Sequence, residues 1–192
     1  MAENKVQFNL KNVHYSVLTK TVGTGGTISY SYATPVAIPG GGVNLTLDPA
    51  GETTPFYADG VIFYNAISNS GYTGTLEMAR VPDAMLKDVW GFTETTTGKV
   101  LQENSSTEPK EFALLYEIDG DADEQLYVLY DCTAQRPGIG STTNTASKNP
   151  VTQSLSLTAA PRNDGLVFGR TTADTPTATK TGWFSTVYQA DS

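Results

Sequence analysis

The chain has 192 residues, a formal net charge of −8 and a single cysteine, Cys132. This length is enough for one domain with an apolar core, and one cysteine excludes an internal disulfide. The 12 lysines and arginines are scattered along the sequence, so no basic face able to grip a nucleic-acid backbone is expected.

The composition is typical of an all-β chain. It is rich in threonine, with 10 tyrosines, 18 glycines and 10 prolines. β-Branched and aromatic residues fit a pleated surface, and glycine and proline mark turns. The sequence therefore predicts a mainly β fold, a two-sheet antiparallel β-sandwich or barrel, with residues 1–192 forming a single domain.

Period-two alternation locates strands in the first part of the chain. Apolar residues change parity along the opening strand, which predicts a bulge or bend near Lys11 and Asn12. Half-buried antiparallel strands are predicted at residues 6–17, 28–38, 43–48 and 72–78.

One segment, "VPDAMLKDVWG", predicts a short helix over about residues 82–90. Pro82 suits the first turn, and Gly91 can adopt the left-handed conformation that ends a helix. A helix of under three turns is not stable alone, so its apolar stripe is expected to pack on the sheet. That stripe consists of Met85, Leu86, Val89 and Trp90.

The strongest hairpin signal lies at residues 112–118 and 126–133. Both runs are apolar on both faces at their centres, which predicts a hairpin in the middle of a sheet, with Cys132 as a small core residue. The acidic turn at residues 119–124 has the opening spacing of a calcium loop but lacks its sixth-position glycine and closing glutamate. It is interpreted as a solvated turn, with weak calcium binding left open.

Residues 151–159 predict a further strand whose second face carries only hydroxyl groups, at Thr152, Ser154, Ser156 and Thr158. Three segments do not alternate and are predicted to be irregular: residues 21–26, a long loop at 137–150 and a flexible threonine-rich segment at 170–182. Polar loops as long as the last two commonly bind something. An N-terminal arm is expected at about residues 1–6.

Residues that could perform chemistry are few. His14 is the only histidine and lies between strand-like residues, so a structural role is expected; one histidine and one cysteine cannot build a zinc site. No Gly-x-Ser-x-Gly turn occurs, and the glycines at 138–140 lack the Gly-Lys-Ser/Thr of a phosphate loop. The sequence predicts a protein that is not an enzyme, without catalytic, metal or cofactor residues.

Nearly the whole chain resembles the major tail tube proteins of long, non-contractile-tailed phages of Gram-positive bacteria. Four stretches carry the resemblance: "IPGGGVNLTLDPAGETTPFYADG", "GYTGTLEMARVPDAMLKDVWG", "PKEFALLYEIDGDADEQLYVLYDCTAQRP" and "GWFSTV". It implies a sandwich with one flanking helix and a structural virion protein that assembles into hexameric rings stacked as the tail tube. DNA would pass through the tube without specific binding, and the tape measure, terminator and distal tail proteins would be partners.

The resemblance also gives candidate residues for two surfaces. Acidic and hydroxyl groups on a lumen wall would let DNA slide, because negative charge repels phosphate. The candidates for that wall are Glu117, Asp131, Thr152, Ser154, Ser156 and Thr158. The connection around residues 48–60, the N-terminal arm and the 137–150 loop are expected to contact neighbouring subunits or the next ring. Candidate contact residues are Lys5, Asp48, Asp59, Gly138, Thr143 and Lys148.

An alternative from another class is a jelly-roll or immunoglobulin-like module that binds carbohydrate or a cell surface, which exposed aromatic residues at one loop-rich end would support. The N-terminal residues show no apolar leader, and the longest apolar run, "FALLY", is far too short to span a membrane. We therefore expect synthesis and assembly in a host cytoplasm, a place in the virion, and no membrane contact.

Overall fold

The structure, a computed structural model, describes residues 4–143 and 150–189. It is mainly β, with 48% strand and 8% helix, and its sheets are antiparallel, as predicted. The strands are β1 Gln7–Val22, β2 Ile28–Tyr32, β3 Val36–Ala37, β4 Gly42–Ala50, β5 Thr53–Ala58, β6 Val61–Ile67, β7 Gly71–Met78, β8 Thr93–Glu94, β9 Leu101–Gln102, β10 Phe112–Gly120, β11 Gln125–Ala134, β12 Gln153–Ala159 and β13 Phe168–Arg170. The helices are α1 Asp83–Trp90 and α2 Thr177–Gly182.

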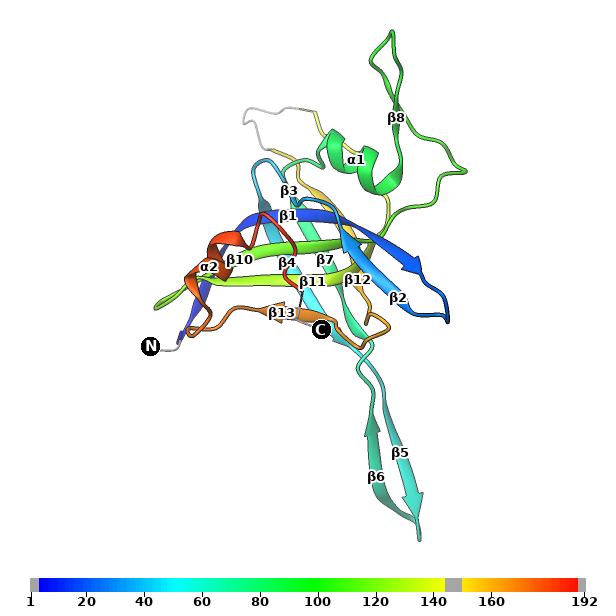
Figure 1. Ribbon diagram of the computed structural model, residues 1–192, viewed down its shortest axis with the longest axis vertical. Helices are drawn as coiled ribbons and strands as arrows, with labels where there is room; N and C mark the ends of the chain where they lie inside the picture. The colour runs from blue at the N-terminus through cyan, green and yellow to red at the C-terminus, as the bar shows by residue number, and fades with distance from the viewer. Residues whose placement is uncertain (1–3, 144–149, 190–192) are drawn as a thin grey trace.

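Nine of the strands form one continuous antiparallel sheet in the order β2-β1-β10-β11-β12-β7-β4, with β13 added to β11 and β3 added to β1. The sheet bends so that β4 and β7 cross behind β10 and β11, which gives the two packed layers of a β-sandwich (Figure 1). Gly42 allows the start of β4 to approach β1 closely, because a Cβ there would lie 2.6 Å from Leu10 Cδ2.

The main core lies between the two layers. Its side chains come from β1, β7, β10, β11 and β12, and the largest fully buried ones include Tyr15, Leu76, Phe112 and Leu114. Cys132 belongs to this core, and burial raises the pKa of its thiol above the ordinary range. The predicted role of Cys132 as a core residue is confirmed.

Helix α1 closes one end of the sandwich (Figure 1). Pro82 stands at its N-cap, and Gly91 ends it with φ 66°, the left-handed cap that the sequence predicted. Met85, Val89 and Trp90 are buried, and Leu86 packs on the core while partly exposed. The predicted helix, and the packing of its apolar stripe on the sheet, are confirmed.

The β10–β11 hairpin lies between β1 and β12, in the middle of the sheet as predicted. Its second face forms a smaller core with the C-terminal part of the chain, where Trp183 and Val187 cover Leu115 and Val128. The indole N–H of Trp183 donates to the Tyr127 carbonyl at 3.3 Å. The hairpin is therefore covered on both faces by its own chain.

The structure corrects two predictions about local structure. The threonine-rich segment at 170–182, predicted to be flexible, contains helix α2. The strand predicted at 28–38 divides into β2 and β3, with Pro35, which has no backbone N–H to give to a ladder, in the break.

The predicted bend of β1 is confirmed. The register of β1 against β10 shifts between Lys11 and His14, and Asn12 has φ 51°. Asparagine tolerates this left-handed conformation better than most residues. Neither helix in the described part of the chain is long and apolar enough to cross a membrane.

Candidate assembly surfaces

The β5–β6 hairpin projects from the end of the molecule opposite α1 (Figure 1). Its strands form a separate two-stranded sheet and, among the described residues, pair only with each other. Seven large apolar side chains on it are 54–81% exposed: Phe56, Tyr57, Val61, Ile62, Phe63, Tyr64 and Ile67. A lone two-stranded hairpin is marginally stable in water, and exposed apolar patches of this kind mark interaction sites.

The tip of this hairpin is a two-residue turn at Asp59 and Gly60. Both residues have positive φ, 52° and 77°, as the favoured type I′ turn requires. Asp-Gly between two apolar runs is a strong hairpin signal, and it could have located these strands from the sequence. The expectation for this stretch is limited to a connection around residues 48–60 that contacts neighbours.

Four strands of the large sheet, β2, β3, β4 and β13, are paired on one side only within the described ranges 4–143 and 150–189, and β4 and β2 are the longest of them. β4 pairs only with β7, and β2 pairs only with β1. Their free N–H and C=O groups can extend the sheet into another chain, which is why open edges favour association.

The outer face of β12, β7 and β4 is polar over three adjacent strands, and we call it the hydroxyl-rich face. Across it, Ser156 lies beside Thr75, and Thr75 beside Thr46. Its members are Asn44, Thr46, Asp48, Thr73, Thr75, Glu77, Ser154, Ser156 and Thr158. None of these side chains is a cation. The predicted wall residues of β12 therefore lie on one exposed face, with Thr152 at its end donating to Glu77.

The two predicted wall carboxylates lie elsewhere. Glu117 and Asp131 are each only 4% exposed, so the expectation that they offer free negative charge to a wall is wrong for this chain. Lys20 binds Asp131 at 2.7 Å and Glu111 at 2.8 Å. Burial raises the pKa of Asp131 above its ordinary value, while the hydrogen bond from Lys20 opposes the shift.

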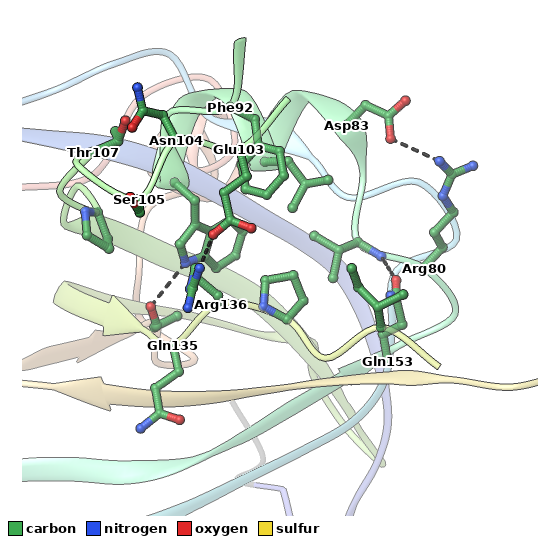
Figure 2. Close-up of a pocket in the computed structure, with 17 residues that line it drawn as sticks. Arg80, Asp83, Phe92, Glu103, Asn104, Ser105, Thr107, Gln135, Arg136 and Gln153 are labelled. Carbon is green, nitrogen blue, oxygen red and sulfur yellow. Dashed lines mark hydrogen bonds and ion pairs between the residues drawn. The ribbon is translucent and has the colours of Figure 1, made fainter. Parts of the chain in front are cut away.

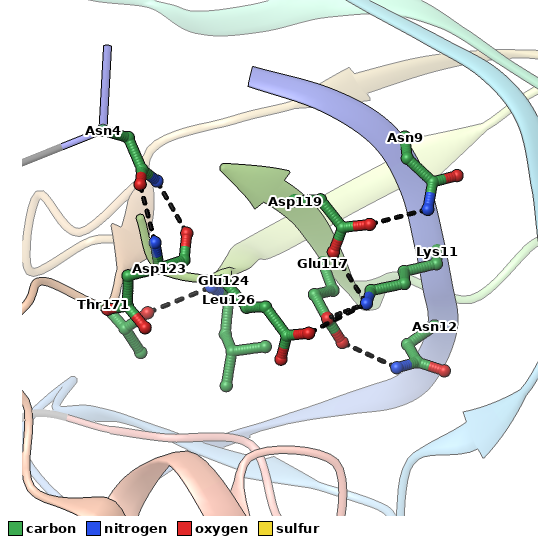
Figure 3. A network of polar contacts seen from close by, with 10 residues as sticks. All are labelled: Asn4, Asn9, Lys11, Asn12, Glu117, Asp119, Asp123, Glu124, Leu126 and Thr171. Atoms are coloured by element: carbon green, nitrogen blue, oxygen red, sulfur yellow. Dashed lines mark hydrogen bonds and ion pairs between the residues drawn. The ribbon is translucent and has the colours of Figure 1, made fainter. Parts of the chain in front are cut away.

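Glu117 belongs to a polar network around Lys11 at the acidic end of the β10–β11 hairpin (Figure 3). The Lys11 ammonium lies 2.9 Å from Glu117, 2.7 Å from Asp119 and 3.1 Å from Glu124. The hydrogen bonds that Lys11 donates to these carboxylates, that to Asp119 foremost, raise the pKa of Lys11 above its usual range. The three carboxylates are close enough to hold a metal ion, but Lys11 supplies the positive charge there.

The acidic turn is also tied to the N-terminal arm. The Asn4 side chain donates to the Asp123 carbonyl and accepts from the Asp123 backbone N–H (Figure 3). It also accepts from the backbone N–H of Ala122, and Lys5 N–H donates to Asp121 at 2.7 Å. Residues 4–6 of the predicted arm thus lie on their own chain, and residues 1–3 lie outside the described residues. Lys180 of α2 adds an ion pair to Asp123 at 2.6 Å.

A cleft of about 1000 Å³ opens between α1, the 103–109 segment and the start of the 137–150 loop (Figure 2). Trp90 forms its floor, 3% exposed, with its indole N–H on the Ala134 carbonyl at 3.2 Å. Apolar side chains line it: Val81, Leu86, Phe92, Pro109, Pro137 and Ile139. Two ion pairs lie along its rim, Arg80 with Asp83 and Arg136 with Glu103.

The other predicted contact residues are dispersed. Asp59 is at the hairpin tip, Asp48 is on the hydroxyl-rich face, and Gly138 and Thr143 are exposed in the 137–150 loop. Gly138 accepts a hydrogen bond from Gln153 at 3.3 Å. Lys148 lies outside the described residues.

The contacts of His14 fit the structural role expected for it. Its Nδ1 is 2.8 Å from the Asn12 carbonyl, and its ring stacks on Phe184 with centroids 4.6 Å apart. No nucleophile is among these contacts.

A scan against protein-family models and a search of curated proteins found no match to the chain.

Proposed function

We propose that this chain is a structural protein that self-assembles into hexameric rings stacked as the tail tube of a long-tailed phage. The observation that carries the proposal is the β5–β6 hairpin, whose seven apolar side chains are left exposed by all the residues that the structure describes. Burial of apolar area stabilises by about 25 cal/mol per Å². Association with a second copy that covers these residues would be stabilised by this burial, and the contact would also stabilise the hairpin.

Two further features support self-assembly. The free sides of β4 and β2 allow sheets of adjacent copies to join edge to edge, which removes exposed edges when a ring closes. The hydroxyl-rich face suits a lumen wall, because it carries Asp48 and Glu77 and no cation that would hold DNA phosphates. In this proposal it replaces the buried Glu117 and Asp131 as the lumen surface.

The carbohydrate-binding alternative gains less support. Its aromatic platform was expected at a loop-rich end, yet Trp90 in the cleft is 3% exposed, while Phe56, Tyr57, Phe63 and Tyr64 lie on a projecting hairpin. A sugar site is usually concave, with aromatic rings accessible inside it.

The test is the concentration dependence of assembly, followed by light scattering after size exclusion and by negative-stain microscopy. We expect the wild-type chain to form rings or tubes, and the Phe56→Ser/Phe63→Ser variant to remain a monomer with unchanged far-UV circular dichroism. Val100→Ser removes an apolar side chain of similar exposure, 55%, from another loop and serves as the control. A wild-type chain that stays monomeric at millimolar concentration and binds glycans instead would refute the proposal.

A further inference from the structure

The hairpin and the cleft lie at opposite ends of the molecule. α1, which bounds the cleft, is at one end of the longest axis, and β5–β6 extends beyond the other (Figure 1). No bending of a single chain brings the two together across the intervening sandwich. Any contact between them must therefore join two copies, head to tail.

We propose that the β5–β6 hairpin of one copy seats in the cleft beside α1 of the next copy. This inference rests on the proposed self-assembly and adds the receiving site to it. The occupant is a second copy of this chain, and the contact is heterologous, so it repeats along a ring or a stack instead of ending at a dimer.

The hairpin and the cleft both present apolar surface, and the area on the hairpin is large enough for a stable interface. The hairpin carries four aromatic side chains, and a fully exposed aromatic side chain can bury roughly 200 Å². Because these four are 59–75% exposed, they and Val61, Ile62 and Ile67 together offer an area on the order of the roughly 800 Å² per partner of a stable protein interface. Among the residues that line the cleft, Leu86 and Phe92 are half-buried and Ile139 is fully exposed, so the cleft also has apolar surface to cover.

Charged groups at the edges of the contact allow an ion pair between copies, although Asp83 and Glu103 already pair with the two rim arginines. Residues 51–70, which include the hairpin, contain Glu52 and Asp59 and no lysine or arginine. The cleft rim presents Arg80 and Arg136, with side chains 77% and 64% exposed despite their ion pairs. Exposed pairs of this kind are weak, so the arginines can turn toward an arriving carboxylate.

The test is directional cross-linking by disulfide formation. Ile62→Cys places a thiol on the hairpin, Ile139→Cys places one at the cleft, and native Cys132 is buried and does not interfere. Under mild oxidation, a mixture of the two single variants is expected to form covalent dimers, whereas each variant alone is not. A chain with both substitutions is expected to form a ladder of covalent multimers.

One control and two contrary outcomes complete the test. Ile62→Cys mixed with Ser156→Cys, on the hydroxyl-rich face, is expected to give no dimer. If microscopy shows rings or tubes but Ile62→Cys joins to itself or to Ser156→Cys instead of Ile139→Cys, the seating is wrong and self-assembly stands. If no oligomer forms at any concentration, self-assembly fails and the seating fails with it.

A charge exchange gives a second readout. Asp59→Arg and Arg136→Glu are each expected to raise the concentration needed for assembly by at least threefold, and the chain carrying both to recover part of the loss. If the double variant is no better than the worse single variant, the hairpin tip does not face Arg136.

Discussion

The β10–β11 and β5–β6 hairpins are built alike and lie in opposite environments. Each is an antiparallel ribbon with apolar side chains on both faces. In β10–β11, Leu114 and Leu115 point to opposite sides and are both 0% exposed, whereas in β5–β6 the neighbouring Phe56 and Tyr57 are 59% and 60% exposed. The chain itself thus buries the apolar side chains of β10–β11 and leaves those of β5–β6 exposed.

The difference comes from what the rest of the chain supplies. α1 and the crossing strands cover one face of β10–β11, and the segment from Trp183 to Val187 covers the other. Nothing in the described residues packs on β5–β6. Large apolar side chains on an uncovered hairpin are costly in solution, and this cost is the reason that we propose a partner for them.

The largest expected effect is a contrast between one substitution in each hairpin. Leu114→Ala removes a fully buried side chain and is expected to lower the free energy of unfolding by about 2–5 kcal/mol. Phe63→Ala, at 75% exposed, is expected to change it by less than about 0.5 kcal/mol while weakening assembly. Urea unfolding at low protein concentration measures both. A loss above 1 kcal/mol for Phe63→Ala in the monomer would show that the hairpin packs within the chain.

A second prediction concerns the pH dependence of stability that arises from Asp131, a buried carboxylate of the β10–β11 hairpin. Burial raises the pKa of Asp131 above 3.8, so the native state holds this proton to higher pH than the unfolded state does. Asp131 therefore costs stability as the pH rises above about 4 through its native pKa, and Lys20 reduces that cost. Lys20→Met leaves the carboxylate buried without its cation and raises its pKa further.

We expect Lys20→Met to lower stability by about 1–2 kcal/mol at pH 7, below the value for fully buried pairs because Lys20 is partly exposed. The deficit should shrink as the pH is lowered toward 4, where Asp131 takes up a proton. Lys99→Met, which breaks the 3.6 Å pair with Glu94 in an exposed loop, is the control and should show no such recovery. Thermal unfolding from pH 4 to 8 supplies the measurement. An equal deficit at both ends of that range would mean that Lys20 acts through packing alone.

Much of the fold could be predicted because its signals are local. Pro82, Gly91 and an apolar stripe between them define α1, and the two-sided apolar runs of β10 and β11 place that hairpin in the sheet. The burial of Glu117 and Asp131 could not be predicted, because their partners Lys11 and Lys20 are more than 100 residues away in sequence. The local sequence shows that a carboxylate is present, but only the pairing of β1 with β10 and the packing of the sheet bring a lysine to it.

The candidate surfaces were predictable in part for the same reason. Alternation correctly put Ser154, Ser156 and Thr158 on one face of β12, but only the pairing of β12 with β7 and of β7 with β4 makes that face three strands wide. Asp59 and Gly60 carry a readable hairpin signal. The exposure of that hairpin depends on the absence of a covering element elsewhere, which no local pattern records.

The smallest expected effect on stability lies on the hydroxyl-rich face, which is exposed like β5–β6 but polar, and so needs no cover. Ser154→Ala/Ser156→Ala should change neither the free energy of unfolding, beyond about 0.5 kcal/mol, nor assembly. Ser154→Lys/Ser156→Lys should assemble equally well, but its tubes should retain double-stranded DNA at low salt, since lysines that face DNA bind its phosphates. If the alanine variant fails to assemble, this face is an interface between copies and not a lumen wall. In that case both exposed regions, the polar face and the apolar β5–β6 hairpin, would be contacts between copies, and polarity would not tell an interface from a lumen wall.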